Sequence, residues 1–351
     1  QTGVKSIEGA GEHPIDFWID FKGTIPEGAT PRCAIVRVRY HNYTCEHDIF
    51  VRQGYAPITI NGNAESNNNP AWTSYNVYRF DANNAPVYTK SPLEEGSLFR
   101  RGNRTAILAS NNDRSGFTFG VEPTGSFNVL EFGSATTSQK TWSQLAPSAD
   151  DVKSRFASWS IAGDHERIAT IEDFYTLEST SIHSNINKAY GVLYGDGATE
   201  TQKSVKEAFG YDHNEDPTNS KKGMRGCFVF NVNNSRNIFF PIGKSGYGRR
   251  KGMTSNGEKV GTLRYAQRTD YYNNDGTGNI QYVPLFYDLF ERPGAIYQCR
   301  NRLESTNNEV KNSSAFDINY FTMGFEGFEN GASNNNNGSD SDACFIRTVK
   351  Y

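Results

Sequence analysis

Residues 341–351, SDACFIRTVKY, close the chain and form the last of a series of short, aromatic-rich strand segments. The earlier members of the series are residues 238–250 (IFFPIGKSGYGRR), 284–302 (PLFYDLFERPGAIYQCRNR) and 315–331 (AFDINYFTMGFEGFENG). Everything after Gly223 is typical of strands and turns. These segments decide the fold class, whereas no segment contains a catalytic motif of comparable specificity.

The composition excludes several classes of protein. The 351 residues are 13% aromatic, which supplies enough bulk for a real core. The net charge of −3 gives no broad basic field, so we expect no nucleic-acid partner. The longest apolar stretches, such as residues 284–290, are far shorter than the roughly 18 residues of a membrane span. The start at Gln1, without a basic and apolar leader, fits a mature chain whose export signal or lipid anchor has been removed.

The N-terminal region has the pattern of a β-hairpin. In residues 33–40, one face carries Ala34, Val36, Val38 and Tyr40, and a turn at residues 41–44 leads to a second strand over 46–54. Tyr40 then lies opposite Cys45, and Cys33 lies about 23 Å further along the ladder, so these two cysteines should not form a disulfide. Residues 60–70 are polar and aperiodic. We therefore expect an N-terminal β region over residues 1–60, part of a β-sandwich or a set of assembly strands, and a second domain over 61–351.

Helix signals are few and confined to the middle of the chain. Ser148 with Asp151, and Thr170 with Asp173, resemble capping boxes in front of apolar helical faces. Residues 205–209 form a third short helical pattern that ends at Gly210. Helices in the middle and strands after them predict an α+β fold.

Neither a metal nor a cofactor is strongly indicated. Five cysteines without a CxxC pair favour buried free thiols over a zinc ribbon. A hairpin-tip site made by His41, Cys45 and His47 lacks a fourth ligand, so a plain hairpin is favoured. The Asp-rich loops 212–216, 273–279 and 339–342 could supply calcium ligands, but they do not match EF-hand spacing and are more typical of Asx turns. Gly243-Lys244-Ser245 lacks the context of a P-loop and is interpreted as a turn.

The strand segments, with residues 167–177 (RIATIEDFYTL), resemble the FISUMP-type major paralogous domain over roughly residues 72–351. This resemblance implies a formylglycine-generating-enzyme-like variant of the C-type-lectin-like fold, on surface lipoproteins or fimbrial tip proteins of Bacteroides-like bacteria. It also implies that residues 226–232, 238–242, 295–300 and 344–349 share one sheet. The sequence departs from the family pattern at Tyr297-Gln298-Cys299-Arg300 and at Thr348, so the family disulfide is not carried over.

The candidate ligand face lies in the C-terminal segment. Tyrosine, asparagine and arginine are concentrated there, and binding loops use these residues because rigid rings give contact area while amides adapt their hydrogen bonds. Paired carboxylates such as Glu326 and Glu329 could serve hydrolysis, but solvated loop charges explain them better. The predicted ligand-binding residues are Arg300, Arg302, Asn319, Tyr320, Phe325, Glu326, Phe328, Glu329 and Asn330.

Two functions follow as hypotheses. The first is an extracellular adhesin or ligand-binding protein of the bacterial cell surface, such as a pilus tip subunit, that recognises a host or bacterial glycan or a protein. The second is an enzyme of the formylglycine-generating type or a carbohydrate-active relative. The reactive cysteine pair and the iron-binding histidine motif of related enzymes are missing from the sequence, so we expect no enzymatic activity.

Overall fold

The computed structural model describes residues 22–40, 44–90, 94–100, 103–108, 125–145, 165–177, 185–193, 224–241, 294–299, 314–319, 323–327 and 343–351. Its strands are β1 (Arg32–Tyr40), β2 (Cys45–Gln53), β3 (Ala71–Trp72), β4 (Val77–Phe80), β5 (Pro86–Tyr88), β6 (Ser97–Arg100), β7 (Ala106–Leu108), β8 (Ser126–Leu130), β9 (Thr137–Thr141), β10 (Glu166–Ile168), β11 (Ile186–Leu193), β12 (Met224–Asn231), β13 (Asn237–Pro241), β14 (Gly294–Cys299), β15 (Ser314–Asn319), β16 (Met323–Gly327), β17 (Ala343–Cys344) and β18 (Thr348–Lys350). The described helices are the 3-10 turn η1 (Ser143–Leu145) and α2 (Ile171–Tyr175).

The described residues form an all-β structure, so the predicted α+β class is wrong. The capping box at Thr170 and Asp173 is present, but the helix that it starts has only five residues. The other two predicted helical segments, 148–159 and 205–210, lie outside the described residues. Strands dominate because segments such as β12 and β13 are rich in aromatic and β-branched side chains, which fit a pleated surface.

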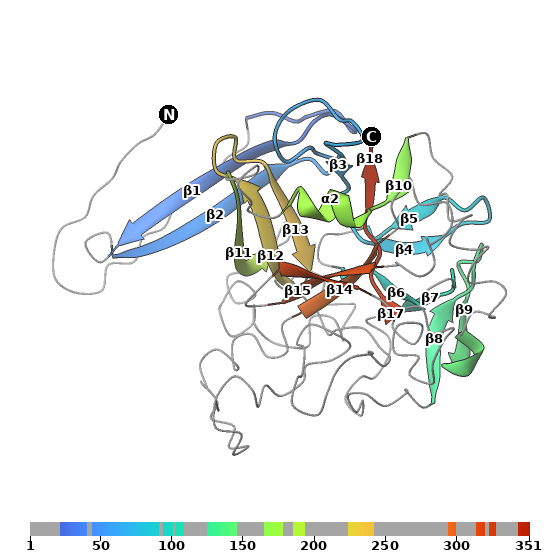
Figure 1. Ribbon diagram of the computed structural model, residues 1–351. Coiled ribbons are helices and arrows are strands. Elements are labelled where there is room, and N and C mark those ends of the chain that lie inside the picture. Colours follow the sequence, from blue (N-terminus) through green and yellow to red (C-terminus); the bar gives the residue numbers. More distant parts are fainter. Residues whose placement is uncertain are drawn as a thin grey trace, which may run out of the picture.

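The strands form small antiparallel sheets. The largest sheet has five strands in the order β17-β6-β7-β8-β9. Three further sheets have three strands each, in the orders β10-β18-β3, β11-β12-β13 and β14-β15-β16. Two-stranded ribbons are formed by β1 with β2 and by β4 with β5. Figure 1 shows β18, at the C-terminal end of the chain, between β3 and β10.

The C-terminal segment changes partners as it crosses the molecule. Cys344 pairs with Phe99 of β6, Phe345 makes a parallel bridge to Tyr297 of β14, and Val349 pairs with Trp72 of β3. The four segments expected to share one sheet therefore do not share one. β12 and β13 pair in a sheet with β11, whereas β14 meets the C-terminal segment through an isolated bridge between Tyr297 and Phe345. The C-terminal segment is short and pairs with β6, β14 and β3 in turn, so its hydrogen-bonded ladder is interrupted between one partner and the next.

An aromatic cluster forms the centre of the main core. Trp72 packs edge-on against Phe174 of α2, with ring centroids 4.9 Å apart, and Phe240 packs edge-on against Tyr297 at 5.4 Å. Tyr297 also contacts Phe345 at 5.9 Å. Each of these rings is buried, and they come from five separate segments of the chain. The same core includes Ile58 and Ile60, which lie on the N-terminal side of the predicted boundary between residues 60 and 61. The boundary itself stays a prediction.

The N-terminal hairpin has the predicted register. Tyr40 pairs with Cys45, and Cys33 pairs with Arg52, so the two cysteines lie at opposite ends of the ribbon. The prediction that they do not bond is confirmed, since both thiols are free. On the apolar face of β1, Val36 and Tyr40 are 36% and 47% exposed. This part of the ribbon projects away from the body of the molecule (Figure 1).

Candidate functional site

Three of the nine predicted ligand-binding residues lie in the sheet β14-β15-β16. Asn319 is the last residue of β15, and Phe325 and Glu326 lie in β16. The other six predicted residues lie outside the described part of the chain: Arg300, Arg302, Tyr320, Phe328, Glu329 and Asn330.

The backbone register separates the described candidates into two groups. Asn319 pairs with Gly294, the first residue of β14. Glu326 pairs with Ala315, which in turn pairs with Gln298 near the other end of β14. Asn319 lies four positions after Ala315 on β15, or about 13 Å away at the usual strand rise. The pairing thus brings Phe325 and Glu326 to the end of the sheet where β14 leads into Arg300, and leaves Asn319 at the opposite end.

Tyr297 attaches this sheet to the core. Its side chain is fully buried, and its hydroxyl accepts a hydrogen bond from Asn76 Nδ2 at 3.2 Å. The adjacent backbone N–H of Gln298 donates to the carbonyl oxygen of Phe345 at 2.8 Å. Burial raises the pKa of Tyr297, and the nearby Arg347 opposes the rise. β14 is therefore fixed by both a side chain and a backbone contact immediately before the predicted ligand residues begin.

Arg347 organises the polar side of this junction. Its guanidinium donates to Asn76 Oδ1 at 2.8 Å, to the carbonyl oxygen of Thr73 at 2.9 Å and to that of Phe239 at 3.1 Å. It also lies over the ring of Phe240, 4.7 Å from the centroid. Burial lowers the pKa of Arg347. Since these three acceptors are neutral, the arrangement is that of a structural tie between segments. The sequence signal, one arginine inside the apolar run FIRTV, was present but was not interpreted as a buried group.

Gln298 of β14 has an unusual polar environment. Its side chain is 3% exposed, and neither amide atom has a hydrogen-bond partner among the described residues. An amide can donate and accept at once, so an unsatisfied buried amide carries a large desolvation cost. In the sequence, Gln298 was noted only as part of a segment that differs from the family pattern, and its burial was not predicted.

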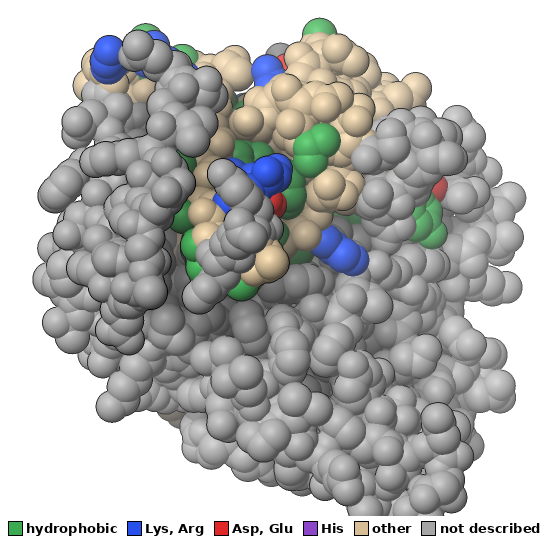
Figure 2. All heavy atoms as spheres, turned by 90° about the vertical axis from the view of Figure 1, so that its left-hand side faces the viewer, with side chains coloured by type: hydrophobic (Ala, Val, Ile, Leu, Met, Phe, Trp, Pro, Cys, Tyr) green, Lys and Arg blue, Asp and Glu red, His purple; other side chains and the backbone are tan. Residues whose placement is uncertain are grey.

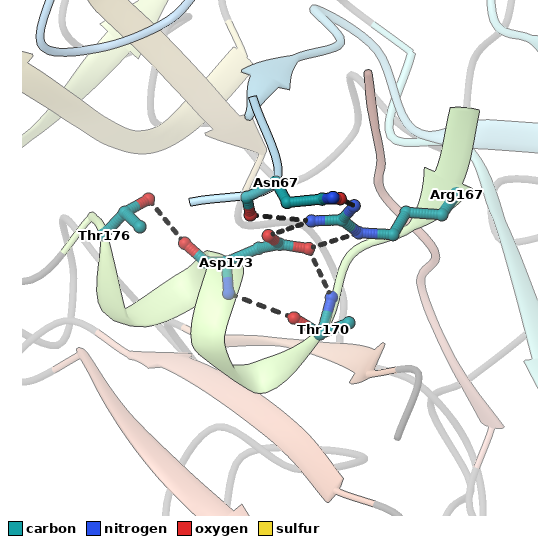
Figure 3. Close-up of polar contacts among 5 residues, drawn as sticks. All are labelled: Asn67, Arg167, Thr170, Asp173 and Thr176. Atoms are coloured by element: carbon teal, nitrogen blue, oxygen red, sulfur yellow. Dashed lines mark hydrogen bonds and ion pairs between the residues drawn. The ribbon is translucent and has the colours of Figure 1, made fainter. Parts of the chain in front are cut away.

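A second buried arginine closes the N-terminus of α2 (Figure 3). Arg167 binds both carboxylate oxygens of Asp173, at 3.2 Å from Nε and 2.8 Å from Nη2. Asp173 Oδ2 also accepts from the backbone N–H of Thr170, whose hydroxyl accepts from the backbone N–H of Asp173. Arg167 further donates to the side chain of Asn67 at 2.9 Å. The predicted capping box is thus confirmed, and it is embedded in a buried ion pair that joins α2 to the segment before β3.

The exposed part of the N-terminal hairpin presents a different surface. Arg37 Nε lies 2.8 Å from Asp48 Oδ1, and Arg39 Nε lies 2.8 Å from Glu46 Oε2. Figure 2 views the molecule from the side toward which the hairpin projects in Figure 1, and basic, acidic and hydrophobic side chains lie together on that face. This surface was predicted as a hairpin, but its exposure was not.

Within the described part of the chain, no group of three or more His, Cys, Asp or Glu side chains could hold a metal ion. His41 and the three Asp-rich loops lie outside it, so calcium binding stays a prediction. None of the described helices is both long enough and apolar enough to cross a membrane.

Comparison with known proteins identifies no relative: no family model, curated protein or solved structure matches the chain. The resemblance to the major paralogous domain therefore stays a prediction from the sequence.

Proposed function

We propose that this chain is an extracellular, surface-attached ligand-binding protein of the adhesin type. It contacts a glycan or a protein through the chain segments that leave the ends of β14, β15 and β16. The observation that carries this proposal is the attachment of β14 to the core at Tyr297 and Gln298, directly before Arg300. Binding residues commonly lie on loops that a rigid scaffold positions, and this sheet provides such a scaffold.

The residue types in and after these strands suit recognition of a polar ligand. Tyr320 and Phe325 supply rings that can cover a sugar or a peptide, and Arg300 and Arg302 supply planar guanidinium groups with several donors. Arginine and tyrosine are also the residues whose truncation most often removes binding energy. The setting that we propose is the bacterial cell surface, with the N-terminal hairpin joining the chain to a larger assembly such as a pilus.

An array of glycans and host matrix proteins, probed with the full chain with and without calcium, tests the proposal. We expect selective binding, which Arg302→Ala and Tyr320→Ala together abolish while the melting temperature stays within a few degrees. Because the described strands separate Asn319 from the Arg300 end, the single variants report which end binds. If both ends contact the ligand, each single variant weakens binding.

Arg32→Ala and Tyr175→Ala are matched controls, because both residues are exposed and lie on β1 and α2. We expect them to bind like the unmodified chain. Absence of selective binding, or loss of binding only through unfolding, would remove the proposal. Chemical turnover of an arrayed glycan would favour the enzyme hypothesis instead.

A further inference from the structure

The β1–β2 hairpin is held firmly at its base. Phe50 stacks on Phe228 with ring centroids 4.7 Å apart. Arg52, whose pKa is lowered by burial, donates to the carbonyl oxygens of Asn237 at 2.8 Å and Ala56 at 2.9 Å. Beyond these contacts the ribbon continues outward for most of its length. These contacts join the base of the ribbon to β12 and β13.

The outer half of the ribbon has an open edge. Among the described residues, β1 and β2 pair only with each other. A two-stranded ribbon is marginally stable in water and gains stability when a third strand is added. No described strand other than β2 pairs with β1, and a strand edge of this kind is a template for an added strand.

The two faces of β1 require different neighbours. One face carries Ala34, Val36, Val38 and Tyr40, of which Val36 and Tyr40 are strongly exposed. The other face carries Arg37 and Arg39 in its outer half, and β1 contains no acidic residue. A strand that lies beside β1 would place alternate side chains next to these two faces.

The arginines have hydrogen-bonding capacity left. Their side chains are 43% and 49% exposed. Among the described residues, Arg39 uses only Nε, toward Glu46, and Arg37 uses Nε and Nη2, toward Asp48 and Glu46. A guanidinium has five donors, so both groups can donate to a further carboxylate on the side of β1 opposite β2.

We propose that the outer edge of β1 binds an extended segment of another polypeptide in which apolar and acidic residues alternate. The segment adds a third strand to the hairpin. Its apolar side chains lie beside Val36 and Val38, and its carboxylates lie beside Arg37 and Arg39. This inference rests on the proposed function in one respect, because the proposed function has the hairpin join the chain to a larger assembly. The inference adds the kind of polypeptide segment that the hairpin binds there.

Titration calorimetry with the full chain and a nine-residue peptide of alternating valine and glutamate tests the inference. We expect saturable 1:1 binding that weakens at high salt, because exposed ion pairs are screened. A second peptide has the same side chains but N-methyl groups on alternate residues, which removes ladder donors. We expect it to bind at least about tenfold more weakly, since edge addition depends on main-chain hydrogen bonds. A peptide of alternating valine and lysine should also bind weakly.

A charge-swapped chain is the matched protein control. The variant Arg37→Asp, Asp48→Arg, Arg39→Glu, Glu46→Arg keeps both cross-strand ion pairs but makes β1 acidic. We expect this variant to fold, to lose the glutamate peptide and to bind the lysine peptide. An unchanged melting temperature confirms that the hairpin is intact.

Several results would overturn the inference. Equal binding of the N-methylated peptide places the contact on a face and not on the edge, and equal binding of both charge types removes the acidic requirement. No binding of the glutamate peptide, or a dimer of the chain that excludes it, removes the partner altogether. If the chain binds a ligand on the array but does not bind the glutamate peptide, this inference alone is overturned. If the chain binds the peptide but no arrayed ligand, only the proposed ligand face is overturned.

Discussion

Arg347 and Asn76 are joined by a hydrogen bond of 2.8 Å from Nε to Oδ1, although 271 positions separate them in the chain. Both side chains are buried, with exposed fractions of 0% and 1%. Asn76 Nδ2 in turn donates to the backbone carbonyl of Glu95 and to the hydroxyl of Tyr297. This pair therefore connects the C-terminal segment, the start of β4 and the candidate ligand sheet in one network.

Replacing Arg347 with Met tests the weight of this network. The change fills a similar volume but leaves Asn76 Oδ1 and the carbonyl groups of Thr73 and Phe239 without this donor. We expect a loss of about 3 kcal/mol in the free energy of unfolding, measured by chemical denaturation. Arg39→Met, at an exposed site, should change stability by less than about 0.5 kcal/mol. Similar values for the two variants would show that the network is dispensable.

The Arg167–Asp173 pair gives a second prediction. Asp173→Asn preserves shape but leaves Arg167 buried without a counter-charge, because both groups are at most 3% exposed. We expect a loss of about 3 kcal/mol in unfolding free energy. Thr170→Ala removes only the capping hydroxyl and should cost about 1 kcal/mol. If the two variants lose the same amount, the carboxylate acts only as a helix cap.

Local patterns in the sequence predicted local structure well. The register of β1 with β2 followed from strand alternation and a four-residue turn, and the start of α2 followed from the spacing of Thr170 and Asp173. Each of these signals involves residues that are close in the chain. Such contacts leave a periodic or fixed-spacing trace that a single sequence reveals.

Long-range structure left no comparable trace. The division of residues 343–350 among β6, β14, β10 and β3 depends on partners that lie up to 279 positions away. An apolar strand segment is compatible with many neighbours, so the shared sheet was predicted wrongly. The burial of Arg167 and Arg347 was also missed, because an arginine in a strand segment is more often exposed and the buried partners of Arg347 lie far away in the sequence.

The candidate ligand residues show a related limit. Arg300, Asn319 and Glu326 were grouped because their composition suits a binding loop. Composition carries no information on register, whereas the pairing of β15 with β14 and β16 separates Asn319 from Glu326 along the sheet. Whether one ligand spans both ends is the question that the single variants in the array experiment answer.

The buried Tyr297 should make the free energy of unfolding fall as the pH rises in the alkaline range. Burial raises its pKa above the ordinary value near 10, so the folded state holds the proton after the unfolded state has lost it. Stability is unaffected by this group below pH about 10 and falls as pH rises further, by up to about 1.4 kcal/mol per pH unit. Tyr297→Phe should make the decline shallower by about that slope in urea denaturation measured across alkaline pH. An equally steep decline for the Tyr297→Phe chain and the unmodified chain would contradict this prediction.

The final prediction concerns the order of assembly. β18 lies between β10 and β3, so the last strand in the sequence is central in its sheet. Phe345, Ile346, Arg347 and Val349 are fully buried. Deleting residues 343–351 should therefore leave a chain without native near-ultraviolet circular dichroism, because two sheets lose a strand and the core loses its central side chains.

A synthetic peptide of residues 341–351 should restore the native signal when added to this truncated chain, since it supplies the same strand pairs and core groups. The same peptide with Phe345→Ala and Arg347→Ala should fail, because it lacks the ring beside Tyr297 and the donor to Asn76. A Lys350→Ala peptide should succeed, because Lys350 is only partly buried. A truncated chain that folds fully by itself would show that the C-terminal strand is an accessory and not the closing element of the fold.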